Sequence, residues 1–392
     1  MDRQWGSLIA VSILLFVGVA GSGCLGGGGG GGGSAGAFKI GVILSLTGSL
    51  AMIAEVIKAG IDLSASDIND AGGVEGKKVN IVYKDDKLDE PTGTTVYNEL
   101  LGEDVQGIVG PVASTNTLQV IFANEQKPDN KKVVIVSPSS TAAELSGKSP
   151  YFFRTVPFDA IQGPNSADVI VKTLQKKRVA ILYQSDIYGN GLKQDFSKEL
   201  VALGGSVVAE EAFQIGQTSF SAQVSMIVAS SPEVVFVPGF YREQTLGIRE
   251  LRSQGYAGPI LASEAIENSD IFQMGGSALK DILFMKASVE SNRPNYKHFV
   301  TNYTAKYGAG PGAYADYGYD ALRVIVDTLV AKGLNATSVQ MKDYMHKTTF
   351  TDTATRDIRF DANGDLVGGS YDLYKIKCND ASCTTGSFVP YS

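Results

Sequence analysis

Residues 38–85 read FKIGVILSLTGSLAMIAEVIKAGIDLSASDINDAGGVEGKKVNIVYKD. This stretch predicts a buried strand over 38–44, a helix over 52–69 with apolar residues at helical spacing, and a second strand over 78–85. A glycine pair ends the helix. The same alternation continues to residue 145 and starts again after residue 160. Because strands that alternate with helices form parallel sheets covered on both faces, the sequence predicts an α/β protein with two doubly wound parallel-sheet lobes.

The remaining elements follow from the same patterns. Further strands are expected at 107–110, 133–136, 178–183, 206–213, 234–237 and 260–262. Further helices are expected at 92–101, 114–124, 141–145, 163–174, 191–203, 219–229, 244–254, 295–307 and 314–332. Phe360, a turn at 361–365 and a strand at 371–376 are expected to form a hairpin.

The first 37 residues predict a leader and a tether. A polar start, an apolar run over 8–20 and small residues precede Cys24, an order typical of a signal peptide, here 1–23, that ends at a lipid-accepting cysteine. Bacterial lipoboxes usually carry leucine three residues before the cysteine, where this chain has Gly21. The alternatives are an ordinary cleaved signal peptide or a signal that is retained as a membrane anchor. The glycine-rich segment 24–37 behaves as a flexible tether. We therefore expect a protein anchored on the outer face of the cytoplasmic membrane, periplasmic or at the cell surface.

Composition excludes several classes of protein. The net charge is −7 and no basic stripe occurs, so a nucleic-acid partner is not expected. The spacing of Cys378 and Cys383 suits a small disulfide in an oxidising compartment. Two cysteines with neither a second pair nor a histidine nearby make a poor zinc site. We expect no metal and no cofactor.

Two segments in the first half place small hydroxyl residues after successive strands. They are 108–115, IVGPVAST, and 134–141, VIVSPSST. In open parallel sheets, ligands bind beyond the carboxyl ends of the strands, and a helix N-terminus favours an anion. The candidates for holding a carboxylate are Ser114, Ser139, Ser140 and Thr141. Simple helix capping is the alternative.

The second half supplies the opposite chemistry. Glu264 lies just past the strand 260–262, Phe240 follows the strand 234–237, and Tyr188 follows the strand 178–183. An acid with aromatic rings suits an ammonium group. A carboxylate site on one lobe and an ammonium site on the other predict an α-amino acid held in a cleft. A solvated loop acid is the alternative for Glu264.

These segments resemble the type I periplasmic binding proteins of branched-chain amino acid ABC transporters, the leucine/isoleucine/valine-binding family. The likeness runs from about Phe38 to about Tyr374. It is carried by 41–48 (GVILSLTG), 69–73 (NDAGG), 108–111 (IVGP), 137–141 (SPSST), 153–155 (FRT), 188–191 (YGNG) and 315–320 (ADYGYD). The resemblance implies a fold of two lobes that are joined by hinge strands and close over a ligand. Its first lobe would comprise 38–158 plus 288–367, and its second 159–287 plus 368–392.

The resemblance also assigns roles to single residues. It implies that Ser114 offers a hydroxyl to the ligand carboxylate, Ser139 a backbone contact, and Thr141 a contact to both carboxylate and ammonium. It implies that Glu264 binds the ammonium and that Tyr188 closes over the ligand.

Two positions depart from the family pattern. Phe240 stands where leucine-binding members carry tyrosine, and Ala113 stands at one position of an early disulfide that this chain lacks. Asp159 is a further ligand candidate. Leu50, Met52, Val112 and Phe240 are expected to line an apolar side-chain pocket; burial in the core of the first helix is the alternative for Leu50 and Met52.

The implied function is capture for an ABC importer. The protein would deliver an amino acid, branched-chain or otherwise apolar, to a membrane permease. The alternative is a ligand-sensing binding protein that presents a small carboxylate or amide to a membrane receptor. An enzyme is not expected, because the sequence has no Gly-x-Ser-x-Gly motif outside the glycine-rich segment 24–37 and no histidine near the hydroxyl-rich turns.

Overall fold

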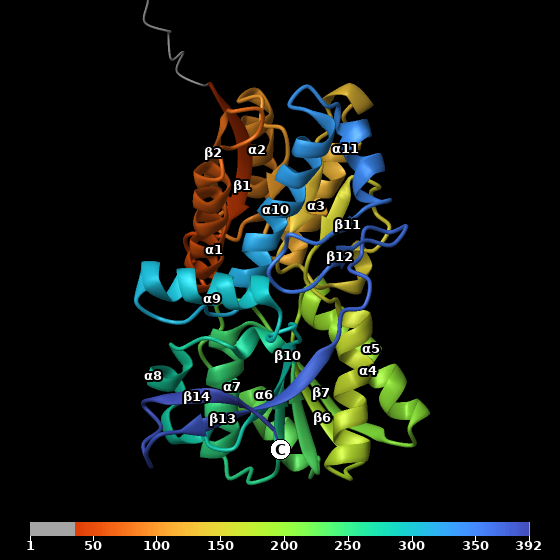
Figure 1. The fold of residues 1–392 in the computed structure, drawn as a ribbon. Coiled ribbons are helices and arrows are strands. Elements are labelled where there is room, and N and C mark those ends of the chain that lie inside the picture. Colours follow the sequence, from red (N-terminus) through yellow and green to blue (C-terminus); the bar gives the residue numbers. More distant parts are fainter. Residues whose placement is uncertain (1–35, 392) are drawn as a thin grey trace, which may run out of the picture. The chain divides into compact units, whose positions relative to one another are not determined.

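Two β-sheets organise residues 36–391, the part of the chain that the computed structural model describes (Figure 1). The first sheet has five parallel strands in the order β2-β1-β3-β4-β5. Its strands are β1 (Ala37–Leu44), β2 (Lys78–Asp85), β3 (Ile108–Val109), β4 (Ile135–Ser137) and β5 (Phe152–Arg154). The predicted α/β class with parallel sheets is confirmed.

The second sheet has seven strands in the order β14-β13-β10-β9-β8-β6-β7. The strands from β10 to β7 are parallel, whereas β13 runs antiparallel to β10 and β14 antiparallel to β13. The strands are β6 (Arg178–Gln184), β7 (Ser206–Phe213), β8 (Val234–Val237), β9 (Ile260–Ala262), β10 (Leu283–Ala287), β13 (Tyr371–Cys378) and β14 (Gly386–Pro390).

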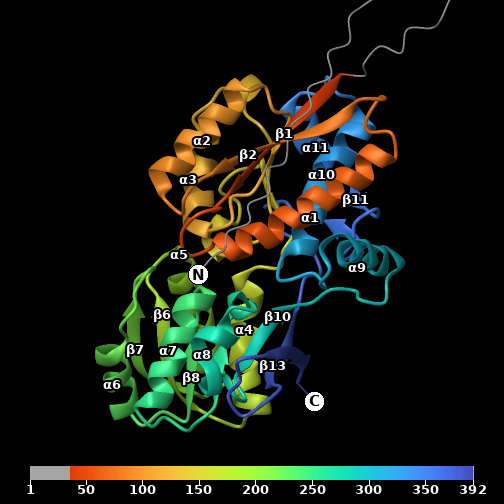
Figure 2. The same cartoon turned by 90° about the vertical axis from the view of Figure 1, so that its left-hand side faces the viewer.

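Helices cover both faces of the first sheet, α1 and α10 on one face and α2 and α3 on the other (Figure 2). Successive residues of a strand point to opposite faces. Accordingly, Val42 and Val109 pack with α1 and α10, whereas Ile43 and Ile108 pack with α2 and α3. The helices of this lobe are α1 (Ala51–Asp70), α2 (Glu90–Gly102), α3 (Ser114–Glu125), α9 (Pro294–Tyr307), α10 (Ala315–Lys332) and α11 (Ser338–Met345). A small ladder of β11 (Thr349–Phe350) and β12 (Ile358–Arg359) completes it.

One glycine lets two of these helices approach closely. A Cβ on Gly60 of α1 would lie 1.8 Å from the carbonyl oxygen of Ala315, the first residue of α10. Only glycine tolerates so close a backbone contact. The contact fixes the start of α10, and therefore the preceding residue Tyr314, beside α1.

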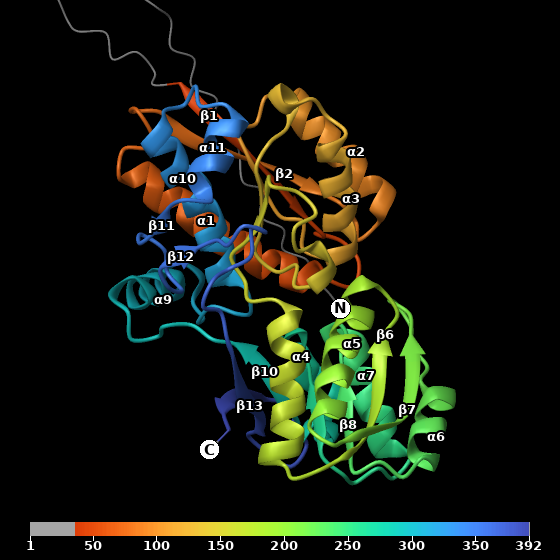
Figure 3. The ribbon, with the colours of Figure 1, turned by 90° about the vertical axis from the view of Figure 1, so that its right-hand side faces the viewer.

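Helices also cover both faces of the second sheet. Those of this lobe are α4 (Asp159–Asp168), α5 (Ile187–Ala202), α6 (Ser221–Ala229), α7 (Tyr241–Ser253) and α8 (Ile271–Gly275). The pair α4 and α5 packs side by side on one face (Figure 3), and α6, α7 and α8 lie on the other (Figure 2).

We call each sheet with its helices a lobe. The chain passes from the first lobe to the second after β5, returns after β10, and crosses again before β13. The described chain from Gly36 onward nevertheless forms one compact unit. The lobe bounds expected from the sequence therefore stay a prediction.

The structure corrects three expected elements. Phe360 pairs with Leu366 across the turn, and β13 pairs with β10 and β14, so the expected hairpin does not form. Residues 141–145 contain only a 3₁₀ turn, Ala143–Leu145. The helix expected over 163–174 begins four residues earlier, at Asp159, and ends in a π turn, Val169–Thr173. The strands β5, β10 and β14 are not among the predicted elements; each pairs with the strand that precedes it in the chain, β4, β9 and β13 respectively.

Candidate functional site

The loop after β3 turns at Gly110 and Pro111, which are joined by a cis peptide bond. Gly110 has a φ of 99°, and a Cβ there would lie 2.1 Å from the carbonyl oxygen of Ile43, so the turn requires glycine. It leads through Val112 to Ser114, where α3 begins. The first N–H groups of a helix have no partner within it. The start of α3 is therefore a place where a negative charge is stabilised.

The loop after β4 is fastened to this first loop. The Ser139 hydroxyl donates to the carbonyl oxygen of Val112 at 3.1 Å. The N–H of Ala142 donates to Ser114 Oγ at 3.2 Å. This bond gives the Ser114 side chain a role other than capping, since the N-cap residue of α3 is Ala113. The two loops form one rigid surface with Ser114 and Ser139 on it.

Ser140 does not belong to the cavity surface. It is fully buried, and its hydroxyl donates to the carbonyl oxygens of Pro111 and Val112 at 3.2 and 3.1 Å. Its oxygen also lies 2.7 Å from Thr117 Oγ1. The structure corrects the expectation of a ligand contact: this hydroxyl fastens the loops together from behind.

A buried arginine supports the second loop. Arg154 Nη1 donates to the carbonyl oxygens of Ser140 and Ala142 at 3.2 and 2.9 Å. Its Nε and Nη2 lie 2.7 and 2.6 Å from Asp365 Oδ1. Both side chains are buried, and burial lowers the pKa of the Arg154 guanidinium. The segment around Thr141 is thus held by a residue that the sequence did not single out as part of a site.

In the second lobe the structure brings three predicted residues together. Tyr188 lies in the first turn of α5, Phe240 directly precedes α7, and Glu264 follows β9. The rings of Tyr188 and Phe240 are nearly parallel, with an interplanar angle of 11° and centroids 5.8 Å apart. Tyr188 Oη lies 3.0 Å from Glu264 Oε1 and 2.9 Å from Ser263 Oγ. The three side chains therefore form one wall.

Glu264 belongs to a pair of buried acids. Asp159 is fully buried and Glu264 is 4% exposed. Gln162 connects them: its Nε2 donates to Asp159 Oδ1 at 3.4 Å, and its Oε1 accepts the N–H of Glu264 at 3.2 Å. Burial raises the pKa of Glu264, and burial together with the charge of Glu264 raises the pKa of Asp159. A cation beside the pair would favour the ionised carboxylates.

These groups surround a small cavity of about 20 Å³, which has room for about one water molecule and is well below the volume of typical ligand pockets. Predicted site residues line it from both lobes: Val112, Ser114, Ser139, Thr141, Tyr188, Phe240 and Glu264. Leu50 lines it as expected, but Met52 does not and is 45% exposed. Ile53, three residues after Leu50 and thus on the same helix face, lies there instead. Asp159 contacts the network behind the cavity without lining it.

Tyr314 is a lining residue that sequence reasoning missed. Its hydroxyl donates to Glu264 Oε1 at 3.3 Å, and its backbone is left-handed, with a φ of 66°. Such a conformation is uncommon for a bulky residue and is found where surrounding structure enforces it. The available signal is its place immediately before Ala315–Asp320, one of the segments that carry the family resemblance.

The comparison with protein families adds an independent finding. Residues 37–382 match the family model described as Periplasmic binding protein. The chain belongs to the periplasmic binding protein family. This membership makes it a binding protein and not an enzyme, as the sequence predicts.

Relatives of this periplasmic binding protein are distant but match over most of their length. The Leu/Ile/Val-binding protein homolog 3 of Brucella melitensis is 28% identical over 86% of this chain and 90% of its own. The crystal structure of a leucine-binding protein from Thermotoga maritima has a TM-score of 0.82 at 28% identity, with 90% and 97% covered. A solute-binding protein from R. palustris, in complex with benzoate, matches with a TM-score of 0.78 at 20% identity, with 91% and 96% covered.

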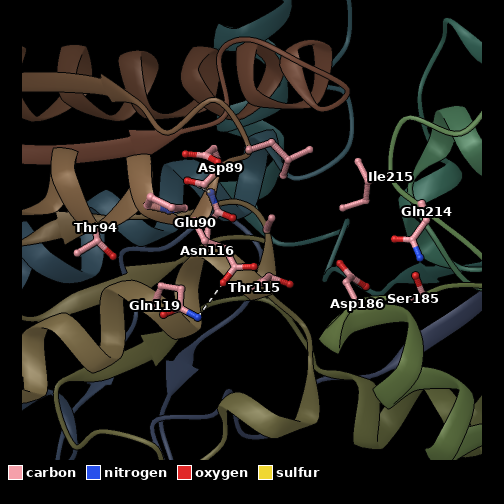
Figure 4. Close-up of a pocket in the computed structure, with 13 residues that line it drawn as sticks. Asp89, Glu90, Thr94, Thr115, Asn116, Gln119, Ser185, Asp186, Gln214 and Ile215 are labelled. Carbon is pink, nitrogen blue, oxygen red and sulfur yellow. Dashed lines mark hydrogen bonds between the residues drawn. The ribbon is translucent and has the colours of Figure 1, made fainter.

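A wider groove in this binding protein also has walls from both lobes (Figure 4). Asp89, Glu90 and Thr115 line it from the first lobe, and Asp186 and Ile215 from the second. None of the predicted ligand residues lines this groove. The smaller cavity, which seven of them line, is the better candidate.

The remaining features considered from the sequence are the disulfide, metal sites, membrane-spanning helices and the leader. The structure pairs Cys378 with Cys383 in a disulfide. Within residues 36–391, no group of three or more His, Cys, Asp or Glu side chains is arranged to hold a metal ion. No helix in the same range has the length and apolar character needed to cross a membrane. The signal peptide and the lipid-accepting Cys24 lie outside the described residues.

Proposed function

We propose that the protein captures an α-amino acid with an apolar side chain in the cavity between its lobes. The observation that carries this proposal is the buried carboxyl of Glu264, which faces the cavity across from the start of α3. A buried carboxylate is stable when an opposite charge neutralises it. The ligand ammonium would supply that charge, with Tyr188 and Tyr314 donating hydrogen bonds to the same carboxylate.

The carboxylate of the ligand would lie against the first lobe. Ser114 and Thr141 offer hydroxyls there, Ser139 offers backbone contacts, and the free N–H groups of α3 point the same way. Hydrogen bonds to a charged group contribute about 1.5–3 kcal/mol each. Because the two charged ends would bind different lobes, only a closed arrangement satisfies both, and binding would shift the balance toward closure.

The side chain of the ligand would meet apolar surface. Leu50, Ile53, Val112 and Phe240 line the cavity, and we propose that this surface selects a branched-chain or other apolar amino acid. Two of the three named relatives support this choice, since one is described as a leucine-binding protein and the other as a homologue of Leu/Ile/Val-binding proteins.

The biological role that we propose is delivery to the permease of an ABC importer. The family and the relatives support it. We also propose, from the sequence order before Cys24, that a lipid on this cysteine holds the protein at the outer face of the membrane.

A thermal-shift screen of the purified protein tests the ligand class. A ligand that binds only the folded state stabilises it by about 2.7 kcal/mol at a hundredfold excess over its Kd. We therefore expect leucine, isoleucine or valine to raise the Tm by several degrees. A rise with benzoate or a short-chain amide, and none with these amino acids, would instead favour the small-carboxylate or amide sensor.

Ser114→Ala and Thr141→Ala test the carboxylate side. Each variant is expected to bind leucine about tenfold more weakly, because a hydrogen bond to a charged group is lost. Calorimetry measures the affinity, and melting without ligand measures the stability. Ser140→Ala is the matched control, because it removes a buried hydroxyl that lies behind the cavity. It should lower the Tm and have little effect on the leucine affinity. Unchanged affinity in both test variants would place the ligand elsewhere.

A further inference from the structure

Two fully buried glutamines lie at the carboxyl edge of the second sheet, next to the cavity but not lining it. Gln184 is the last residue of β6, and Gln244 lies in the first part of α7. A primary amide can donate two hydrogen bonds and accept two, and burying it without partners is costly. Their partners therefore show what these side chains do.

Gln184 connects the two stacked rings through the backbone. Its Oε1 accepts the N–H of Phe240 at 3.0 Å, and its Nε2 donates to Asp186 Oδ2 at 2.8 Å. Asp186 in turn accepts the N–H of Gly189 at 2.9 Å and is the N-cap of α5. Since Tyr188 lies in the first turn of that helix, one amide fixes both rings.

Gln244 links the turn before Phe240 to the segment that carries Glu264. Its Nε2 donates to the carbonyl oxygen of Gly239, which precedes Phe240, and its Oε1 accepts the N–H of Ser263 at 3.1 Å. Ser263 precedes Glu264, and its Oγ lies 2.9 Å from Tyr188 Oη. Three neighbouring strand ends of the second sheet are thus linked by two side chains that do not line the cavity.

We infer that Gln184 and Gln244 are positioning residues that set the spacing of the Tyr188 and Phe240 rings, and thereby the preference of the site for a large apolar side chain. This inference rests on the proposed amino-acid binding. Interiors are packed as densely as organic crystals, so a ring displaced by the loss of its backbone bond changes the width of the pocket. A pocket of changed width discriminates differently between long and short side chains.

Gln184→Met and Gln244→Met test the inference in the full chain. Methionine keeps the unbranched length of glutamine and removes the hydrogen bonds. The readout is the ratio of the Kd values for alanine and leucine, because the alanine side chain is too short to reach the rings. We expect leucine affinity to fall about tenfold or more, as for a pocket misfitted by about one methylene, and alanine affinity to change by less than about threefold. The ratio of the Kd for alanine to the Kd for leucine then becomes smaller.

A purely structural role predicts another pattern. If the glutamines only stabilise the lobe, both variants lower the Tm while the ratio stays that of the wild type, and the inference is wrong. Gln106→Met in the first lobe is the control; it removes one hydrogen bond, to the carbonyl oxygen of Leu334, and Gln106 does not line the cavity. It should leave the ratio unchanged.

Two further outcomes separate this inference from the function on which it rests. Where a methionine variant does not fold, Gln184→Glu keeps the side-chain volume and the acceptor for Phe240 but places a carboxylate against Asp186, and the same decrease in the ratio is expected. A wild-type protein that binds neither amino acid overturns the proposed function and the inference together. A wild type that prefers leucine, with variants of the same preference, overturns the inference alone.

Discussion

Glu264→Gln is expected to weaken leucine binding by about 2–5 kcal/mol, the cost of removing one partner of a buried charge pair. Every 1.4 kcal/mol is a factor of ten in Kd, so the loss is at least about 25-fold. The physical reason is the placement of the carboxyl: it is 4% exposed, and its ordinary alternative partner, water, is excluded. The measurement is calorimetric titration of wild type and variant with leucine at neutral pH.

The unliganded variant is expected to fold at least as well as the wild type. Burial raises the pKa of Glu264, which means that the folded protein stabilises the neutral carboxyl relative to the ionised one. Glutamine has the shape of that neutral form and carries no charge. A loss of affinity with an unchanged or higher Tm therefore cannot be attributed to unfolding.

Two controls make the result specific to the ammonium. The first is 4-methylpentanoate, which is leucine without its amino group; its binding should be the same in wild type and variant, or slightly tighter in the variant. The second is Glu199→Gln, which removes the same charge from α5 at a residue that does not line the cavity. Equal leucine affinity in Glu264→Gln and wild type would remove Glu264 from the site.

The sequence predicts the site best where local pattern and topology agree. Ser114 and Glu264 each lie shortly after a short buried strand, and parallel strands bring their carboxyl ends to one edge of a sheet. Both therefore line the cavity as expected. The helical period likewise places Leu50 inward, but the same period turns Met52 outward and Ile53 inward, a distinction that the prediction overlooked.

Local pattern could not predict contacts made across the chain. Ser139 and Ser140 are equivalent in the sequence, yet one lines the cavity and the other is turned to the carbonyl groups of the preceding loop. Tyr371 begins a strand that pairs with β10 from far upstream rather than with the adjacent Phe360. Gln184 lies at the end of an ordinary buried strand, and nothing nearby indicates that its amide links two loops.

The pair of Arg154 and Asp365 is the strongest case of such a contact, because the two residues are 211 positions apart and both are buried. Asp365→Asn is expected to lower the free energy of unfolding by about 3–5 kcal/mol, since it leaves a buried guanidinium without its counter-charge. Burial lowers the pKa of the Arg154 guanidinium, and Asp365 is the foremost of the charges that oppose this effect. Urea denaturation of the unliganded protein measures the change.

The double variant Arg154→Met, Asp365→Leu separates the stability of this pair from its role at the site. Replacing both members of a buried ion pair with apolar side chains is often neutral or stabilising, so much of the lost stability should return. The leucine affinity of the double variant should be lower than that of the wild type. The reason is that Arg154 also donates to the carbonyl oxygens of Ser140 and Ala142, on either side of Thr141. A double variant that regains both stability and affinity would show that the loop keeps its shape without the arginine. Low affinity at restored stability would mean that the buried pair orients the segment that we propose binds the ligand carboxylate.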